Sequence, residues 1–386
     1  GAVVLTHGHL DHVGSLPALV EGGWGGVILA TRATWAIARI VIRDGLVLEG
    51  ATPDDAERFV GRLDALHRPA PYNQPGMVHD GVFVAFREAG HILGSASVEL
   101  RSAKSRVILS GDLGRPDTPI LRAYNRTWEA DRPVDLVVLE TTYGDREHTS
   151  DHAHIREELL RILERAVERG GHVLVPAFAI GRTQILLYHL NALVESGRLK
   201  DVPVVLDSPM GLEVTETYAA FRNLYDKAAL DRLAYGDDPL DFDGLFAVKR
   251  ARDSERLRER KGPTIVVASS GMCTGGRIVG HLQELLPKEE TCVMFVGYQA
   301  RGTPGRAILE AAKAREERGG VPTVRVGGEE VEVRASVEML SGLSAHADRQ
   351  ELKEWLLAVP DVRRVALHHG EPEAQAAFAR WVAAGG

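Results

Sequence analysis

The chain has 386 residues, of which 44% are hydrophobic and 26% are charged, and its formal net charge is −8. This length indicates two domains rather than one, and the negative charge argues against a protein that coats nucleic acid with a broad basic surface. No apolar run reaches the roughly 18 residues that span a bilayer. We therefore expect no membrane association. Two cysteines cannot form a disulfide framework, so we expect a cytoplasmic location.

Metal-binding residue types gather where the first strand of the chain ends. Residues 2–6 read as a buried strand, and His7, His9, Asp11 and His12 follow within six positions. Imidazole and carboxylate are ligands of zinc and similar divalent ions. At an extended strand end His7 and His9 point to the same side, whereas Asp11 and His12, in the following turn before a helix, can face a second ion. A domain should not open on such a cluster, so we expect strands before residue 1 to be missing.

Later strands of the first part of the chain end in similar residues. His91 follows an apolar run in "GVFVAFREAGHILG", Asp112 ends the strand in "SRVILSGDLGR", and Glu140 ends the strand in "VDLVVLETTYGD". Taken singly, His91 could be a core histidine, Asp112 a turn residue and His369 in "LHHGEP" a loop residue. Their shared position, at a strand end before a glycine-containing turn, favours a common site at one sheet edge.

From about residue 155 the pattern changes to strand–loop–helix units, which occupy residues 170–193, 202–221, 263–286 and 291–314. Apolar strands followed by helices imply a parallel sheet with helices on both faces. After about Val337 the first pattern returns. We therefore predict an α/β protein in which a metal-bearing domain, residues 1–147 and 337–386, is interrupted by an inserted domain, residues 148–336.

The motifs resemble those of a known family. "THGHLDHVG", "GHILGSAS", "LSGDLGR" and "LHHGE" resemble the successive metal-binding motifs of the metallo-β-lactamase fold. "LETTYGDREH", "VPAFAIGRTQ", "ASSGMCTGGR", "GYQARGTPGR" and "SGLSAHAD" resemble the β-CASP family, the RNA-processing branch of that superfamily. The resemblance implies an αββα metallo-β-lactamase sandwich, interrupted by an inserted α/β β-CASP domain with a mainly parallel sheet.

The resemblance also implies a centre with two zinc ions, although the same ligand types would accept manganese or iron. The implied ligands are, for one ion, His7, His9 and His91, for the other, Asp11, His12 and His369, and for both, Asp112. Successive strand residues point to opposite faces, so only one of His368 and His369 should reach the metals. We choose His369, which lies next to Gly370, and interpret His368 as structural.

Two adjacent divalent ions generate hydroxide near neutral pH and clamp a phosphoryl centre, but the same fold also serves lactam, thioester and lactone hydrolysis. The resemblance implies a zinc-dependent ribonuclease that hydrolyses phosphodiester bonds of single-stranded RNA, mainly internally, through a metal-bridged hydroxide. It implies that His346 is the general acid, oriented by Glu140, and that Asp11 takes part in catalysis. The alternative for His346 is a structural position at a helix start.

The inserted domain is expected to bind the RNA through its strand-to-helix loops. The segment "SSGMCTGG" opens a helix after a buried strand, where free N–H groups and the helix dipole favour an anion, although a tight structural turn would have the same sequence. The candidate substrate-binding residues of these loops are Arg182, Ser208, Ser269, Ser270, Gly271, Thr274, Gly275 and Arg306. Phe178 and Tyr298 are candidates for stacking on bases, but core packing is the favoured role for each.

Three further histidines, His148, His152 and His154, could form a second cluster, but a solvated linker that starts a helix is the favoured interpretation. The main alternative function is a 5′-to-3′ exoribonuclease of the same family. A DNA-repair nuclease, a scaffold subunit and a small-molecule metallo-hydrolase are further alternatives; the intact ligands argue against the scaffold, and the inserted domain against the small-molecule enzyme. The expected partners are single-stranded RNA and either a second copy of the chain or an RNA-processing complex.

Overall fold

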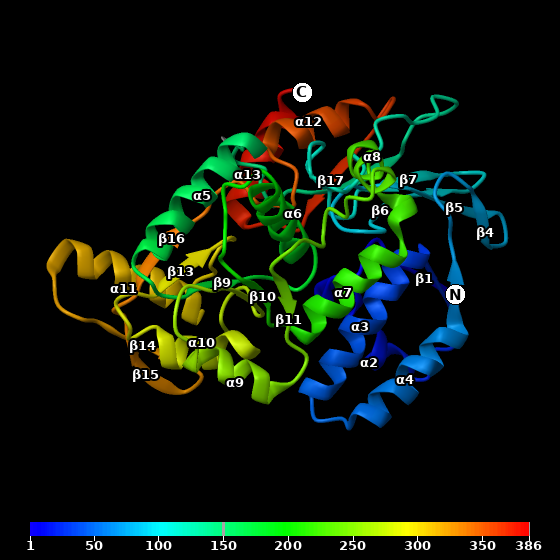
Figure 1. Ribbon diagram of the computed structural model, residues 1–386. Coiled ribbons are helices and arrows are strands. Elements are labelled where there is room, and N and C mark those ends of the chain that lie inside the picture. Colours follow the sequence, from blue (N-terminus) through cyan, green and yellow to red (C-terminus); the bar gives the residue numbers. More distant parts are fainter. Residues whose placement is uncertain (149–150, 386) are drawn as a thin grey trace. The chain divides into compact units, whose positions relative to one another are not determined.

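The computed structural model describes residues 1–148 and 151–385, which form two compact units. The first unit consists of residues 1–148, 217–231 and 345–385. The second unit consists of residues 151–216 and 232–344. Figure 1 labels the elements of both units. No helix in the described parts of the chain is long and apolar enough to cross a membrane.

The first unit contains two β-sheets. The smaller sheet is parallel, and its strands in order are β1 (Ala2–Val4), β2 (Val27–Ala30) and β3 (His67–Pro69). The larger sheet has the order β17 (Val365–His368), β8 (Leu136–Glu140), β7 (Arg106–Leu109), β6 (Ala96–Arg101), β5 (Val82–Glu88) and β4 (Gly76–His79). Strands β17, β8 and β7 run parallel, and the remaining neighbours are antiparallel, so this sheet is mixed.

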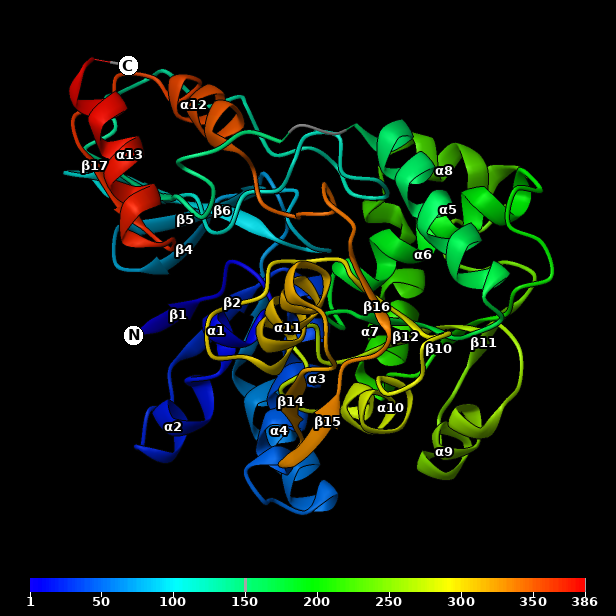
Figure 2. The same cartoon turned by 90° about the vertical axis from the view of Figure 1, so that its left-hand side faces the viewer.

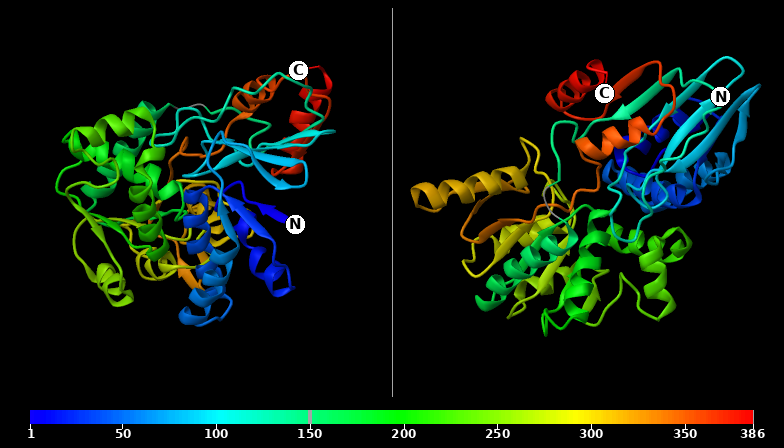
Figure 3. Two further views of the ribbon diagram at one scale, coloured as in Figure 1. Left: turned by 90° about the vertical axis from the view of Figure 1, so that its right-hand side faces the viewer. Right: turned by 90° about the horizontal axis from the view of Figure 1, so that it is seen from above.

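The helices of the first unit cover these sheets. They are α1 (Leu10–Val13), α2 (Leu16–Glu21), α3 (Arg32–Leu48), α4 (Pro53–Leu66), α12 (Arg349–Leu357) and α13 (Pro372–Ala383). Figures 2 and 3 show α12 and α13 beside the larger sheet, and their Trp355 and Phe378 share one buried apolar cluster with Val137 of β8. Because burial of apolar surface fixes both helices on the sheet, the segments just before them, which contain His346 and His369, are held in place.

The second unit is built on one six-stranded sheet in which every neighbouring pair is parallel. Its strand order is β11 (Leu245–Ala247), β10 (Val204–Leu206), β12 (Ile265–Ala268), β9 (Val173–Pro176), β13 (Cys292–Phe295) and β16 (Ser336–Met339). The central strands are buried along their whole length, as expected for a parallel sheet covered on both faces.

The remaining elements surround this sheet or connect its strands. They are α5 (His152–Glu168), α6 (Arg182–Glu195), α9 (Ala251–Glu259), α10 (Arg277–Leu285), α11 (Pro304–Arg318) and the hairpin of β14 (Thr323–Val326) and β15 (Glu329–Glu332). Between β10 and β11 the chain forms α7 (Pro209–Ala220), a short 3-10 helix (Arg222–Leu224) and α8 (Lys227–Ala234), and residues 217–231 of this stretch are part of the first unit.

The predicted fold class is confirmed, since the chain is α/β with mixed pairing in the first unit and a parallel sheet in the inserted region. The predicted domain boundaries differ from the observed division at two places. Residues 217–231 belong to the first unit, where the Asp226 N–H donates to the Ile120 carbonyl over 2.7 Å. Residues 337–344 belong to the second unit, because β16 pairs with β13 as an edge strand. Sequence periodicity does not reveal either pairing.

Strand-to-helix loops of the second unit meet at one edge of its sheet, because the carboxyl ends of parallel strands lie together. Strands β9, β10, β12 and β13 lead into α6, α7, α10 and α11 there. The loop between β12 and α10 requires a glycine. Gly276 has a φ of 73°, and a Cβ at this position would lie 2.3 Å from the Ser269 carbonyl oxygen.

Candidate metal centre

The histidine-rich segment after β1 has a tightly specified backbone. His7 is fully buried, and the next residue has to be a glycine, since a Cβ at Gly8 would lie 2.7 Å from Cγ2 of Ile37 in α3. His9 is the N-cap of α1, so Asp11 and His12 lie within this short helix. The sequence had instead predicted that they lie in a turn before a helix. They therefore project from a single helical turn that directly follows the two histidines.

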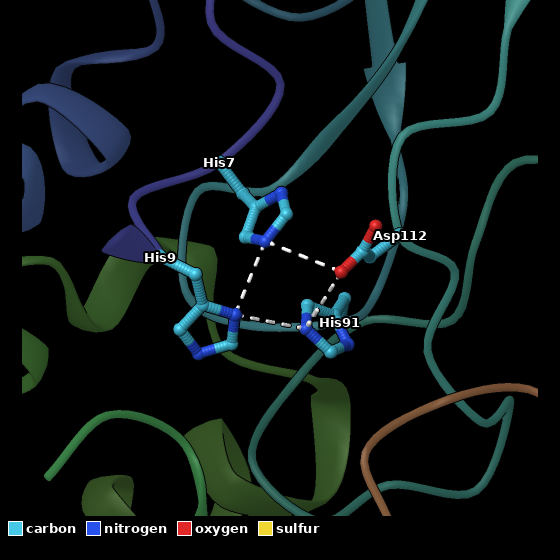
Figure 4. Close-up of side chains that lie close together, drawn as sticks. All are labelled: His7, His9, His91 and Asp112. Carbon is cyan, nitrogen blue, oxygen red and sulfur yellow. Dashed lines mark hydrogen bonds and ion pairs between the residues drawn. The ribbon is translucent and has the colours of Figure 1, made fainter. Parts of the chain in front are cut away.

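Four side chains form a first group of candidate ligands: His7, His9, His91 and Asp112. Nδ1 of His9 lies 3.1 Å from Nε2 of His7 and 3.2 Å from Nε2 of His91. Oδ2 of Asp112 lies 3.5 Å from the His7 nitrogen and 3.7 Å from the His91 nitrogen. Figure 4 shows the three rings and the carboxylate turned toward one another, with the dashed lines joining these atoms. They come from the ends of β1, β5 and β7, as the strand-end pattern predicted.

A second group lies next to the first and shares Asp112 with it. Asp11, His12 and His369 have ligand atoms within 4.8 Å of one another, and Nε2 of His369 lies 3.2 Å from Oδ2 of Asp11. Asp112 reaches this group with both oxygens, since Oδ1 is 3.4 Å from Nε2 of His12 and Oδ2 is 3.6 Å from Nε2 of His369. His368 is not in either group among the described residues. Asp112 is therefore the residue between the two groups.

The geometry of the first group fits a tetrahedral zinc ion. Ligand atoms that bind zinc at roughly 2.0–2.1 Å in a tetrahedron lie roughly 3.3 Å from one another, and the separations of 3.1 to 3.7 Å between the donor atoms match this spacing. Oδ1 of Asp112 is also buried and makes no hydrogen bond to any described residue. A buried carboxylate oxygen without a hydrogen bond is costly unless a cation compensates it. The residues present therefore fit the metal that the motifs imply.

The second ring nitrogen of four candidate ligands has a partner that fixes the orientation of the ring. Nδ1 of His369 lies 3.0 Å from the Thr142 hydroxyl, and Nδ1 of His91 lies 3.2 Å from the Ala345 carbonyl oxygen. The Thr6 hydroxyl lies 3.2 Å from Nδ1 of His7 and 3.5 Å from Nδ1 of His12. Such partners hold a histidine in the tautomer that a metal requires. Sequence reasoning missed Thr6 and Thr142, although each is within two residues of a singled-out residue.

Electrostatics of the site favour a bound cation. Burial lowers the pKa of His7 and of His91 well below the ordinary histidine value, so both imidazoles are neutral, which is the form that binds a metal. Burial also raises the pKa of Asp112. The hydrogen bond between His369 and Asp11 raises the pKa of His369 to about 9 and lowers the pKa of Asp11. A divalent ion would stabilise both carboxylates, and its binding releases the His369 proton.

His346 and Glu140 form a pair beside both groups. Nδ1 of His346 lies 3.1 Å from Oε1 of Glu140, and the His346 ring is 4.5 Å from the His91 ring and 5.7 Å from the His369 ring, centroid to centroid. Glu140 is fully buried, and its oxygens also accept hydrogen bonds from the Leu113 and Thr142 N–H groups. Burial opposes a charged imidazole, but the Glu140 carboxylate outweighs it and raises the pKa of His346 above its ordinary value.

The alternative position for His346, at a helix start, does not describe the structure. Helix α12 begins at Arg349 with Asp348 as its N-cap, so His346 lies in an irregular segment two residues before the cap. His346 is 20% exposed on its side chain, whereas its partner Glu140 is buried. The pair therefore combines an accessible imidazole with a buried carboxylate that orients it.

Most of the predicted substrate-binding side chains of the second unit bond to the unit itself. Ser208 Oγ lies 2.7 Å from Ser269 Oγ, and Arg182 donates to the Val296 carbonyl. Arg306 donates to Glu310 on its own helix over 2.6 Å. These contacts tie neighbouring loops of the sheet edge together.

The β12–α10 loop is closed by one of its own hydroxyls. Ser270 Oγ accepts hydrogen bonds from the N–H groups of Thr274 and Gly275, over 3.0 and 3.3 Å. Gly271 is buried, and a Cβ there would lie 2.9 Å from the Phe178 ring. Within this loop Thr274 has an exposed side chain. Only part of the predicted set is thus presented to solvent.

Two aromatic side chains differ from their favoured prediction. Phe178 is 41% exposed and Tyr298 is 54% exposed, so neither is a core residue. Phe178 follows the buried strand β9 by two residues, and an apolar residue at such a place reads as core in the sequence alone. Of the three histidines assigned to a linker, His152 and His154 do start helix α5, and His154 is exposed. His148 is only partly exposed, and Nε2 of its ring lies 2.9 Å from the His346 carbonyl oxygen.

Three family descriptions match successive parts of the sequence. Residues 1–177 match the metallo-beta-lactamase superfamily, residues 183–308 match the Beta-Casp domain, and residues 330–386 match the Zn-dependent metallo-hydrolase RNA specificity domain. Together with the histidine and aspartate groups, these matches identify a metal-binding cluster of a zinc-dependent hydrolase.

Similar proteins of known name cover nearly the whole chain. Ribonuclease TTHA0252 from Thermus thermophilus is 38% identical over 387 residues, which are 99% of this chain and 84% of that protein. The transcription termination factor FttA from Cenarchaeum symbiosum is 28% identical over 96% of this chain, but the chain spans only 57% of that factor.

One solved structure resembles the fold at low sequence identity. A protein of unknown function from Enterococcus faecalis superposes with a TM-score of 0.52 and 12% identity, over 97% of this chain and 76% of that one. This likeness concerns the fold alone. The identity to the Thermus ribonuclease and the three successive family matches are the decisive findings, and the chain therefore belongs to the β-CASP family of metallo-β-lactamase-fold ribonucleases, which are metal-dependent hydrolases.

Proposed function

We propose that this protein is a zinc-dependent ribonuclease that hydrolyses phosphodiester bonds of single-stranded RNA, mainly at internal positions. The observation that supports this most strongly is the pair of ligand groups joined by Asp112, with the His346–Glu140 pair beside them. Its relative in Thermus is named a ribonuclease, and the carboxyl-terminal family match is described as an RNA specificity domain. A nuclease uses all of these features together, whereas a scaffold uses none.

The two groups suit two zinc ions that share Asp112. The proposed ligands are, for one ion, His7, His9 and His91, for the other, Asp11, His12 and His369, and for both, Asp112. Two ions held by these residues would supply a nucleophile at neutral pH and neutralise charge on the phosphoryl oxygens. Asp11 is 63% exposed on its side chain, so one side of the second group faces solvent and can admit a substrate.

His346 is the proposed general acid. Its Nδ1–H is held by Glu140, so Nε2 is the atom that delivers a proton. In the reaction water adds its hydroxyl to phosphorus and releases its other proton to solvent. The bond from phosphorus to the 3′ oxygen breaks, and the departing oxygen takes the proton from Nε2. The products are a 5′-phosphate and a 3′-hydroxyl. The Glu140 carboxylate raises the pKa of His346 and so favours the protonated ring that this step uses.

The second unit is the proposed RNA-binding part, through the carboxyl edge of its parallel sheet. The exposed rings of Phe178 and Tyr298 are suited to stacking on unpaired bases, and this type of contact favours single strands over duplexes. Thr274 presents a hydroxyl from the β12–α10 loop. For Arg182, Ser208 and Ser269 the internal hydrogen bonds support a role in shaping these loops rather than in direct contact with RNA.

An internally structured RNA, labelled at one end in one sample and at the other end in a second, tests this function. With zinc, the purified full chain should produce discrete internal fragments, and a chelator should abolish them until zinc is restored. Release of mononucleotides from the 5′ end would support the 5′-to-3′ exonuclease instead. Absence of cleavage by protein that contains its metals would contradict the ribonuclease.

His346→Ala should retain the metals and lose most of the cleavage, because a general acid contributes roughly 10²–10⁴-fold to the rate. We would measure the metal content by elemental mass spectrometry and the initial rates of cleavage on the same RNA. His154→Ala is the matched control, since His154 is an exposed histidine on α5. Cleavage by His346→Ala at the wild-type rate would refute the assignment of the acid.

Thr142→Val should weaken zinc binding, because it removes the hydroxyl that lies 3.0 Å from Nδ1 of His369 while keeping the side-chain shape. Loss of such a partner typically lowers metal affinity roughly 10- to 100-fold. Competition with a chromogenic chelator measures the effect, and Thr127→Val, at an exposed threonine, is the control. If both variants hold zinc as tightly as the wild type, the Thr142 hydroxyl does not support His369 as a metal ligand.

A further inference from the structure

His148 makes two contacts to the segment that contains His346. Nε2 of its ring lies 2.9 Å from the His346 carbonyl oxygen, and its backbone N–H donates to Oδ2 of Asp348 over 2.9 Å. A carbonyl oxygen can only accept, so the ring must donate from Nε2–H. Tyr143 packs edge-on against the His148 ring at 5.4 Å and limits its rotation. The two contacts therefore hold the chain at the His346 carbonyl and at Asp348, two residues further on.

The peptide units next to His346 have hydrogen-bond partners too. The Ala347 N–H donates to the Leu113 carbonyl over 2.7 Å, and the Ala345 carbonyl lies 3.2 Å from the His91 ring nitrogen. The carbonyl of His346 itself is held by His148. This segment belongs to no helix or strand, since it ends at the N-cap of α12. Without His148, the His346 carbonyl would lose this hydrogen bond, and the peptide unit between His346 and Ala347 could rotate about its anchor at the Ala347 N–H.

Such a rotation would act on the proton donor. The His346 ring is fixed at its Nδ1 end by Glu140 over 3.1 Å, and at its backbone by the His148 hydrogen bond. Both anchors are needed to aim Nε2 at one point, because a side chain pivots about its Cα. A displacement of about 1 Å at a reacting group can cost roughly 100-fold in rate.

A metal site is the other use that the neighbouring groups suggest, since His148, Asp348 and Glu351 have ligand atoms within 4.8 Å of one another. These atoms already have partners. Nε2 of His148 bonds to the His346 carbonyl, and Asp348 accepts from His148 N–H and from Glu351 N–H as the cap of α12. The arrangement is therefore one that orders a loop and caps a helix.

From these contacts we propose that His148 is a positioning residue for His346, a role that rests on the proposed function. His148 acts through the hydrogen bond from its ring to the His346 carbonyl and touches neither substrate nor metal. Its loss should therefore impair protonation of the leaving group while metal binding and attack on phosphorus continue.

A substrate with a leaving group that needs no proton separates these effects. His148→Phe keeps a ring but removes the donor, His148→Gln retains an amide N–H of similar reach, and His154→Phe is the same change at an exposed histidine. Each zinc-loaded full chain is compared on RNA and on bis(p-nitrophenyl) phosphate. For His148→Phe we expect kcat on RNA to fall roughly 10- to 100-fold, with KM, metal content and cleavage of the nitrophenyl ester close to wild type. His148→Gln should recover much of the loss.

Equal losses on both substrates, or no loss on RNA, would overturn the role of His148. A crystal structure of His148→Phe tests the same role without any assay: the proposal expects Nδ1 of His346 to have left Oε1 of Glu140, and an unchanged contact of 3.1 Å would overturn it. Failure of the proposed function has a different signature, which is a wild-type chain that contains zinc and leaves RNA intact.

Discussion

A single buried carboxylate determines how the first unit has to be built. Asp112 is 2% exposed, and four imidazole nitrogens from three segments of the chain surround its two oxygens at 3.4 to 3.7 Å. A buried charge is costly unless it is compensated. Burial keeps two of these imidazoles, His7 and His91, neutral, so these two can compensate the carboxylate only by sharing a cation with it. A bound metal satisfies both demands, and the fold brings the strand ends together to hold it.

This constraint explains the positions of the other polar groups. The candidate ligands follow the end of β1 in the smaller sheet and the ends of β5, β7 and β17 in the larger sheet, because strand ends are places where distant segments meet without burying unpaired backbone. His369 adopts a φ of 51°, a left-handed conformation that is uncommon for a non-glycine residue. Strain of this kind persists where surrounding contacts specify it, and here Thr142 and Asp11 hold the ring from two sides. The second unit has no equivalent group of buried ligands among its described residues, and its contribution lies in exposed loops.

The residue types of the site could be predicted from sequence, but their mutual contacts could not. Histidine and aspartate after apolar strands indicated the ligands, since few roles other than metal binding gather these residue types at strand ends. The contacts of Thr142 and His148 could not be predicted, because each is a hydrogen bond to a partner about 200 positions away. The exposure of Phe178 was not predicted for another reason. Its apolar sequence context resembles a core strand, and only the loop geometry exposes the ring.

The proposed function requires two metal ions that share Asp112. Diffraction from a crystal of the full chain grown with zinc, with data collected on both sides of the zinc absorption edge, locates such ions directly. The account predicts two anomalous peaks, one among His7, His9 and His91 and the other among Asp11, His12 and His369, with the Asp112 carboxylate in contact with both. A single peak, or two peaks of which one has no contact with Asp112, would contradict it.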